Sequence, residues 1–145
     1  MSWIKFDYTP LWKKDGSGIT RVPLLESELI LGQKRFPSRG LVDSGAYMTL
    51  AHSDIANILE IDRAACPKRP VTGISGETEG FVKEVNLSVK HLREVITIPV
   101  LFVDNLRTAL LLGHEGFFES YRVKFQADQN VFEVSRSPSE QYGKR

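Results

Sequence analysis

Short apolar runs, broken repeatedly by turn-forming residues, are the feature of this chain that most constrains its fold. The runs are rich in β-branched and aromatic residues, and Gly, Pro, Asn or Asp ends most of them. Runs of this kind are typical of β-strands joined by tight turns. The sequence therefore predicts an all-β domain.

One stretch has helical spacing instead. Ile55, Ile58 and Leu59 fall at positions i, i+3 and i+4, so all three lie on one face, which we expect to pack on the core. Ser53 precedes them and is the expected N-cap of this helix. A second helical turn is expected at residues 117–118. The pattern thus adds one or two short helices to the β domain.

The expected strands follow one another closely along the chain. They are pieces at residues 22–25 and 28–31, a strand ending at residue 42, a hairpin within 71–82, a second hairpin from 85–89 and 94–103, an apolar strand at 109–112, and a last hairpin from 121–125 and 131–134. We expect residues 1–20 to be an irregular lead-in, residues 21–135 the folded domain, and residues 136–145 a polar tail.

Length and composition fit one domain with an ordinary apolar core, since 41% of the 145 residues are hydrophobic. The net charge is +1 and the basic residues form no run, so we expect neither nucleic acid nor membrane as a partner. The chain has no signal-type run, and no stretch approaches the roughly 20 apolar residues of a membrane span. With Cys66 as the only cysteine, no intrachain disulfide forms, which suits a cytoplasmic protein.

The residues usual in metal sites and nucleophilic sites lack the required arrangement. His52, His91 and His114 do not have the spacing of metal ligands, so no metal or cofactor is expected. Ser75 lacks the final glycine of a nucleophile elbow. Cys66 precedes a proline in an expected loop and has no evident base. None of these side chains is a candidate for catalysis.

Three short segments in a fixed order are the candidates for chemistry. They are Leu41-Val42-Asp43-Ser44-Gly45-Ala46 at a strand end, the glycine-bracketed hairpin Thr72-Gly73-Ile74-Ser75-Gly76, and Leu111-Leu112-Gly113 before a helical turn. An Asp-Ser-Gly triplet alone is most often a turn, because Asp and Ser bond their own backbone there. The three segments together, in this order, indicate more than a turn.

Together they resemble the signature of the retropepsin-like aspartic proteases, both retroviral and cellular. In that family an apolar pair precedes Asp-Thr/Ser-Gly-Ala and a Thr follows shortly, as Thr49 does here. The resemblance covers residues 22–134, and it implies a closed acid-protease barrel with one lobe per chain. It further implies catalysis by Asp43, with Ser44, Gly45 and Ala46 in the active-site loop.

The resemblance also assigns roles to the other two segments. Thr72, Gly73, Ile74, Ser75 and Gly76 would form a flap that closes over an extended peptide. Leu111, Leu112 and Gly113 would support the catalytic loop structurally.

Hydrolysis of a peptide without metal or nucleophile requires two carboxyl groups, one to take a proton from water and one to protonate the carbonyl oxygen. This chain has a single Asp-Ser-Gly triplet. A two-fold homodimer supplies the second copy, because it brings the same residue of each subunit to the axis. The resemblance therefore implies an aspartic endopeptidase whose dyad is Asp43 from two subunits.

Two positions depart from the retroviral pattern. Tyr47 and His114 stand where many retroviral members carry an Asp and an Arg that pair near the active site. Both partners are replaced together, so neither charge is left unpaired, and a Tyr–His contact is a possible substitute. The change affects any substrate subsite built on that Asp and leaves the dyad itself intact.

Two alternatives to an active protease stay open. The domain is either a non-catalytic module for dimerisation or peptide binding, or a regulated enzyme whose weak dimer limits its activity. For the dimer, we expect the interface at residues 121–134, with Phe132 as a contact.

Overall fold

The computed structural model describes residues 2–73 and 76–138. The elements in chain order are β1 (Ile4–Asp7), β2 (Thr9–Trp12), β3 (Ile19–Val22), β4 (Leu24–Leu31), β5 (Lys34–Val42), β6 (Leu50–His52), α1 (Ser53–Ile58), the 3-10 turn η1 (Arg63–Ala65), β7 (Lys68–Gly73), β8 (Gly76–Val89), β9 (Ile96–Val103), β10 (Leu110–Leu112), α2 (Phe117–Ser120), β11 (Tyr121–Gln126), the 3-10 turn η2 (Ala127–Gln129) and β12 (Val131–Arg136).

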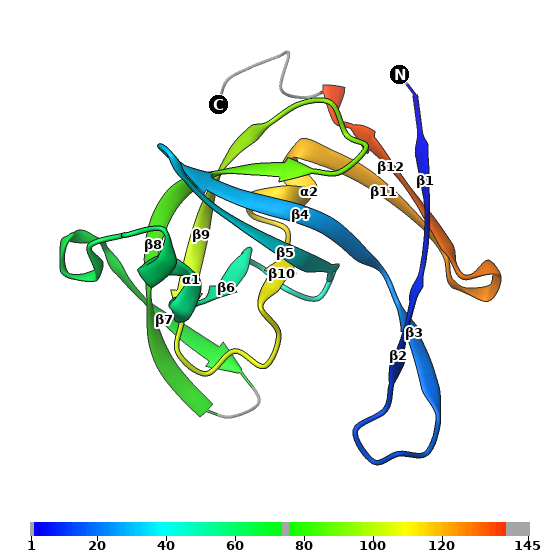
Figure 1. Ribbon diagram of the computed structural model, residues 1–145, viewed down its shortest axis with the longest axis horizontal. Coiled ribbons are helices and arrows are strands. Elements are labelled where there is room, and N and C mark those ends of the chain that lie inside the picture. The colour runs from blue at the N-terminus through cyan, green and yellow to red at the C-terminus, as the bar shows by residue number, and fades with distance from the viewer. Residues whose placement is uncertain (1, 74–75, 139–145) are drawn as a thin grey trace.

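Six strands close into a barrel, which Figure 1 shows from one side. Their order is β4-β5-β10-β6-β9-β8, and the barrel closes because β4 pairs with β8 as well as with β5. Strand β7 adds to the outer edge of β8. With its two short helices, this architecture confirms the predicted all-β closed barrel of one lobe.

The barrel consists of two halves with the same plan. Each half has an antiparallel hairpin, then a short strand, then a short helix: β4, β5, β6 and α1 in the first, and β8, β9, β10 and α2 in the second. Each short strand pairs in parallel with the long strand of the other half, β10 with β5 and β6 with β9. The two short strands pair with each other in the middle. The residues that follow β5 and β10 therefore lie side by side.

Apolar side chains from both halves fill the barrel. Phe81 and Phe102 stack with their ring centroids 5.5 Å apart, and both are almost completely buried. Phe117 of α2 is also fully buried and packs edge-on against Phe118. This closely packed interior gives the loops at the strand ends a rigid base.

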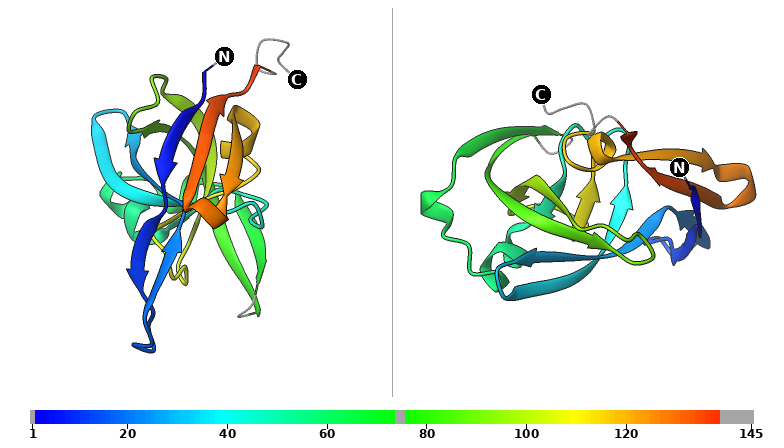
Figure 2. Two further views of the ribbon diagram at one scale, coloured as in Figure 1. Left: turned by 90° about the vertical axis from the view of Figure 1, so that its right-hand side faces the viewer. Right: turned by 90° about the horizontal axis from the view of Figure 1, so that it is seen from above.

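The predicted irregular lead-in at residues 1–20 is wrong. Strand β1 pairs with β12 in a three-stranded sheet, β1-β12-β11, and β2 and β3 form a hairpin of their own. Figures 1 and 2 show this hairpin and the β7–β8 hairpin extending toward the same end of the molecule. Trp12 on the β2–β3 hairpin is 76% exposed. The partner of β1 lies at the opposite end of the sequence, so local patterning did not reveal this strand.

The predicted boundary of the polar tail is also wrong. Strand β12 continues to Arg136, whose Nε lies 2.6 Å from Glu94 Oε1. The Ser137 backbone N–H donates to the Ser120 carbonyl at 2.8 Å. These contacts fasten the chain beyond the predicted end of the domain. Residues 139–145 of the predicted tail lie outside the described residues.

Helix α1 forms where predicted, but two details of that prediction are wrong. The N-cap is His52, whose Nδ1 accepts a hydrogen bond from the Asp54 backbone N–H at 3.0 Å. Ser53 is the first helical residue. Its hydroxyl donates instead to Asp104 Oδ1 at 2.6 Å. Ile55 is buried, whereas Ile58 is 48% exposed, because a helix of under two turns turns only a narrow face to the core.

No helix within the described ranges is long and apolar enough to span a bilayer.

Candidate active site

Asp43 is the first residue after β5, and its own loop holds it in place. Its backbone N–H donates to the Leu112 carbonyl at 3.0 Å, across the pairing of β5 with β10. Its carboxylate Oδ1 accepts a hydrogen bond from the Gly45 backbone N–H at 2.9 Å. Its carbonyl accepts from the Ala46 N–H at 3.1 Å, which closes the turn. Asp43 is therefore half-buried, and one neutral backbone donor, the Gly45 N–H, binds its carboxylate.

The chain after β10 clamps this loop from the other side. The Gly113 N–H donates to Thr49 Oγ1 at 3.2 Å, and that hydroxyl donates to the Glu115 carbonyl at 2.9 Å. The His114 N–H donates to the Ala46 carbonyl at 2.9 Å. The Glu115 N–H donates to the Tyr47 carbonyl at 2.7 Å. Thr49 is fully buried, so its hydroxyl acts as an internal link between the two segments.

The segment after β10 approaches the loop after Asp43 so closely that only a glycine fits at position 113. A Cβ at this position would lie 2.2 Å from the Met48 carbonyl oxygen and 2.6 Å from the Ala46 carbonyl oxygen. Both neighbours are backbone atoms, which cannot move aside without opening the loop. Leu112 is fully buried and Leu111 pairs with Leu41. This segment therefore lies directly beside the loop that holds Asp43.

Gly45 is crowded by the carboxylate that it binds. A Cβ there would lie 3.2 Å from Asp43 Oδ1, closer than side chains normally approach. Ser44, by contrast, is exposed at the turn. In the single chain, Ser44 is therefore exposed and Asp43 is half-buried beside it.

Strands β7 and β8 form the glycine-bracketed hairpin predicted as a flap. Strands β7 and β8 pair from Lys68 with Phe81 up to Gly73 with Gly76, and Thr72 pairs with Glu77. Ile74 and Ser75, which complete the predicted flap, lie outside the described residues. The hairpin extends from the barrel at the lower end of Figure 1.

Arg69 of β7 links the hairpin to the segments beside Asp43, a contact that the sequence did not predict. Its Nη1 lies 3.3 Å from Glu115 Oε1 and 3.1 Å from Met48 Sδ. Met48 and Glu115 are themselves bridged through their backbones. No local pattern marks Arg69, because its partners are close only after the barrel has closed.

His114 does not depend on Tyr47 for its contacts. Its Nε2 lies 2.7 Å from the Ser44 carbonyl oxygen, and its ring packs against Phe118 with centroids 5.0 Å apart. Tyr47 is 75% exposed, beside a surface pocket that it shares with His114, Phe118 and two glutamates. His114 thus binds the loop that holds Asp43.

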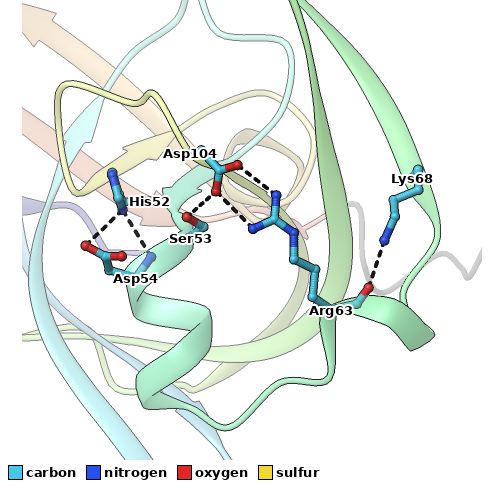
Figure 3. A network of polar contacts seen from close by, with 6 residues as sticks. All are labelled: His52, Ser53, Asp54, Arg63, Lys68 and Asp104. Atoms are coloured by element: carbon cyan, nitrogen blue, oxygen red, sulfur yellow. Dashed lines mark hydrogen bonds and ion pairs between the residues drawn. The ribbon is translucent and has the colours of Figure 1, made fainter.

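A second aspartate, Asp104, follows β9 as Asp43 follows β5, and Figure 3 shows its contacts with Arg63 and Ser53. Arg63 donates to its two carboxylate oxygens at 3.0 and 2.8 Å, and Ser53 donates to Oδ1 at 2.6 Å. The Arg63 hydrogen bonds, followed by that from Ser53, lower the pKa of Asp104 to about 2. Asp104 is thus ionised at neutral pH and held in an ion pair with Arg63.

No group of three side chains suited to bind a metal gathers within the part of the chain that the structure describes.

No protein-family model matches the sequence, and no curated protein matches it. Among solved structures, a retropepsin-like aspartic protease from Rickettsia conorii has a TM-score of 0.63 and 15% identity, over 92% of this chain and 98% of that one. The simian foamy virus protease has a TM-score of 0.42 and 23% identity, over 63% of this chain and 88% of its own. A Legionella pneumophila protein of unknown function has a TM-score of 0.39 and 16% identity, over 66% and 85%.

The likeness to the Rickettsia protein covers nearly the whole of both chains. Together with the closed barrel and its strand order, it shows that this chain has the retropepsin-like fold.

Proposed function

We propose that the protein is an aspartic endopeptidase that hydrolyses peptide bonds with a water molecule activated by two Asp43 carboxyl groups. The observation that carries the proposal is the setting of Asp43. Its partly buried carboxylate stands at the end of β5 with a backbone N–H on Oδ1, while backbone bonds clamp its loop against the segment after β10. A carboxyl group that must both accept and donate protons needs this kind of neutral, fixed setting.

The proposed reaction requires a dimer, because the chain has one Asp-Ser-Gly triplet. Two carboxyl groups held within hydrogen-bond distance do not both ionise, because their negative charges repel. The pair therefore shares one proton. The ionised member takes a proton from water, and the protonated member donates to the carbonyl oxygen of the substrate. The exposed Ser44 hydroxyl is positioned to meet its counterpart across a two-fold axis that brings the two loops together.

The β7–β8 hairpin is the proposed flap over an extended peptide substrate. A long antiparallel hairpin that projects from the barrel offers backbone groups for strand-like binding of a peptide. The contacts of Arg69 with Met48 and Glu115 anchor its base beside the catalytic loop. Motion of the hairpin would then be confined to its outer part.

The dimer interface is proposed within residues 121–134, but Phe132 cannot report on it. Phe132 is fully buried, so a charged replacement there would disrupt the core of the single chain. Phe125 of β11 is 41% exposed, so a charged replacement there would test the interface without disrupting the core. Strand β11 pairs only with β12 among the described strands, which leaves its other edge available for pairing with a second copy.

The proposal is tested by comparing the wild type with Asp43→Asn on a library of unfolded peptides across pH, with fragments identified by mass spectrometry. We expect Asp43→Asn to lower kcat/KM by at least about 10²-fold, because the amide neither accepts nor donates the required proton. Asp104→Asn is the matched control, since it makes the same change at the aspartate in the equivalent position.

A mixing experiment tests the shared dyad. An excess of the Asp43→Asn chain added to the wild type should suppress cleavage, because mixed dimers hold only one of the two required carboxyl groups. Equal cleavage by the wild type and Asp43→Asn would exclude the aspartyl mechanism. Peptide binding without cleavage by either chain would favour the non-catalytic module.

A further inference from the structure

The side chain of His114 binds the peptide group that links Ser44 to Gly45, next to the proposed catalytic aspartate. Its Nε2 lies 2.7 Å from the Ser44 carbonyl oxygen. A carbonyl oxygen only accepts hydrogen bonds, so Nε2 must carry the proton. The histidine is therefore a hydrogen-bond donor to the catalytic loop.

The other end of the same peptide group binds the catalytic carboxylate. The Gly45 N–H donates to Asp43 Oδ1 at 2.9 Å. A peptide group is planar, and in the trans form its C=O and N–H point in opposite directions. Whatever holds the Ser44 oxygen in place therefore also directs the Gly45 N–H toward Asp43.

His114 is itself held firmly enough to do this. Its backbone N–H donates to the Ala46 carbonyl at 2.9 Å, and its ring packs against Phe118 of α2. The neighbouring Gly113 and Glu115 bond to the same loop. The imidazole is thus fixed from the barrel side and reaches across to the exposed turn.

We propose that His114 is a positioning residue for catalysis, which orients and polarises the 44–45 peptide group so that its N–H stays on the Asp43 carboxylate. This inference rests on the proposed function for its effect on turnover. A donor on the carbonyl oxygen also strengthens the N–H of the same group as a donor, because hydrogen bonds in a chain polarise one another. Loss of the imidazole donor removes the hydrogen bond that holds the carbonyl end of this peptide group, so its N–H is less firmly directed toward the carboxylate.

The test uses three replacements that separate the ring from the donor. His114→Phe keeps a flat ring against Phe118 but has no donor. His114→Gln places an amide donor at about the reach of Nε2, and His114→Asn places one at about the reach of Nδ1, which is too short for the Ser44 oxygen. We expect kcat to fall about tenfold in the Phe and Asn variants, the usual worth of one hydrogen bond, with KM within about twofold. The Gln variant should recover most of the lost kcat.

A second readout does not depend on activity. In the amide ¹H–¹⁵N spectrum of the full-length protein, the Gly45 cross-peak should move in the Phe and Asn variants and return toward its wild-type position in the Gln variant. Thermal unfolding of each variant identifies any that fail to fold. Wild-type kcat and an unmoved Gly45 cross-peak in His114→Phe would overturn the proposal, as would equal loss in all three variants.

The two proposals fail in different ways. If the wild type and Asp43→Asn cleave equally, the proposed function fails and no role in turnover is left for His114, while the Gly45 cross-peak still reports whether the histidine holds the peptide group. If Asp43→Asn is inactive and the His114 variants keep wild-type kcat, the function stands and the positioning role is overturned.

Discussion

Each half of the barrel places an aspartate at the same point, but the two aspartates have different hydrogen-bond partners. Asp43 follows β5 and Asp104 follows β9, each beside the end of a short strand from the other half. Asp43 receives the N–H of Gly45, whereas Asp104 receives the guanidinium of Arg63 and a hydroxyl. A cation and a hydroxyl thus hold the Asp104 carboxylate in an ion pair, whereas a single backbone N–H binds the Asp43 carboxylate.

The residue facing each aspartate contributes to this difference, in addition to Arg63. Leu112 pairs with Val42 and is followed by Gly113, and His52 pairs with Val103 and is followed by Ser53. Gly113 has no side chain, so the loop segments approach closely, and the hydrogen bonds of Asp43 in the described ranges are with backbone groups. Ser53 has room for its hydroxyl, which binds Asp104. The same arrangement of strands thus gives a loop held by backbone hydrogen bonds in one half and a salt bridge in the other.

Exchanging Gly113 and Ser53, the residues that face the two aspartates, should produce the largest change in stability. Gly113→Ser brings a Cβ within 2.2 Å of the Met48 carbonyl, so we expect destabilisation of about 3 kcal/mol or more and loss of the native loop. Ser53→Gly, its counterpart, removes one hydrogen bond and adds backbone freedom near the helix start, for about 1–2 kcal/mol. Urea unfolding of both variants measures the difference. Similar stabilities would show that the two positions do not differ as argued.

Neutralising the second aspartate should have a smaller effect, confined to stability. Asp104→Asn loses an ion pair whose side chains are about half exposed, at 49% and 51%. Water screens such a pair, so we expect a cost of about 1 kcal/mol or less and a fall in Tm of about 3 °C. Cleavage should stay at the wild-type rate. A large loss of activity in Asp104→Asn would contradict the division of roles between the halves.

The smallest effect is the pH dependence of that stability difference. The pKa of Asp104 is about 2 in the folded protein, below its usual 3.8, so the ion pair adds stability above about pH 4 and loses it as the pH falls toward 2. The gap in unfolding free energy between the wild type and Asp104→Asn should therefore be constant near neutral pH and close between pH 4 and 2. Urea titrations at several pH values measure it. A gap that persists at pH 2 would show that the ion pair is not its source.

The sequence predicted those features that depend on local patterns. The apolar strand ending at Val42 and the turn residues that follow place Asp43 at a strand end, as the structure has it. Two glycines bracket the β7–β8 hairpin and mark its position. The all-β class follows from the short runs themselves. In each case residues close in sequence determine the conformation, so the pattern contains the information.

Features that depend on distant partners could not be predicted. Strand β1 has its partner at the other end of the chain, so its four residues looked like irregular lead-in. The Arg69 contacts and the His114–Ser44 bond join segments that meet only when β10 inserts beside β5. The helix cap shifted from Ser53 to His52 because Asp104, far along the chain, takes the serine hydroxyl. Local propensity gives way wherever a distant group competes for the same atom.

The interleaved strands also have a kinetic consequence. Gly40 pairs with Leu110, and Leu50 pairs with Leu101, so each half completes its sheet only with a strand from the other. Neither half forms all of its strand pairings by itself, so we expect neither half to fold independently of the other. The chain must bring distant segments together before most of its contacts form, which is the topology of a slow, cooperative folder.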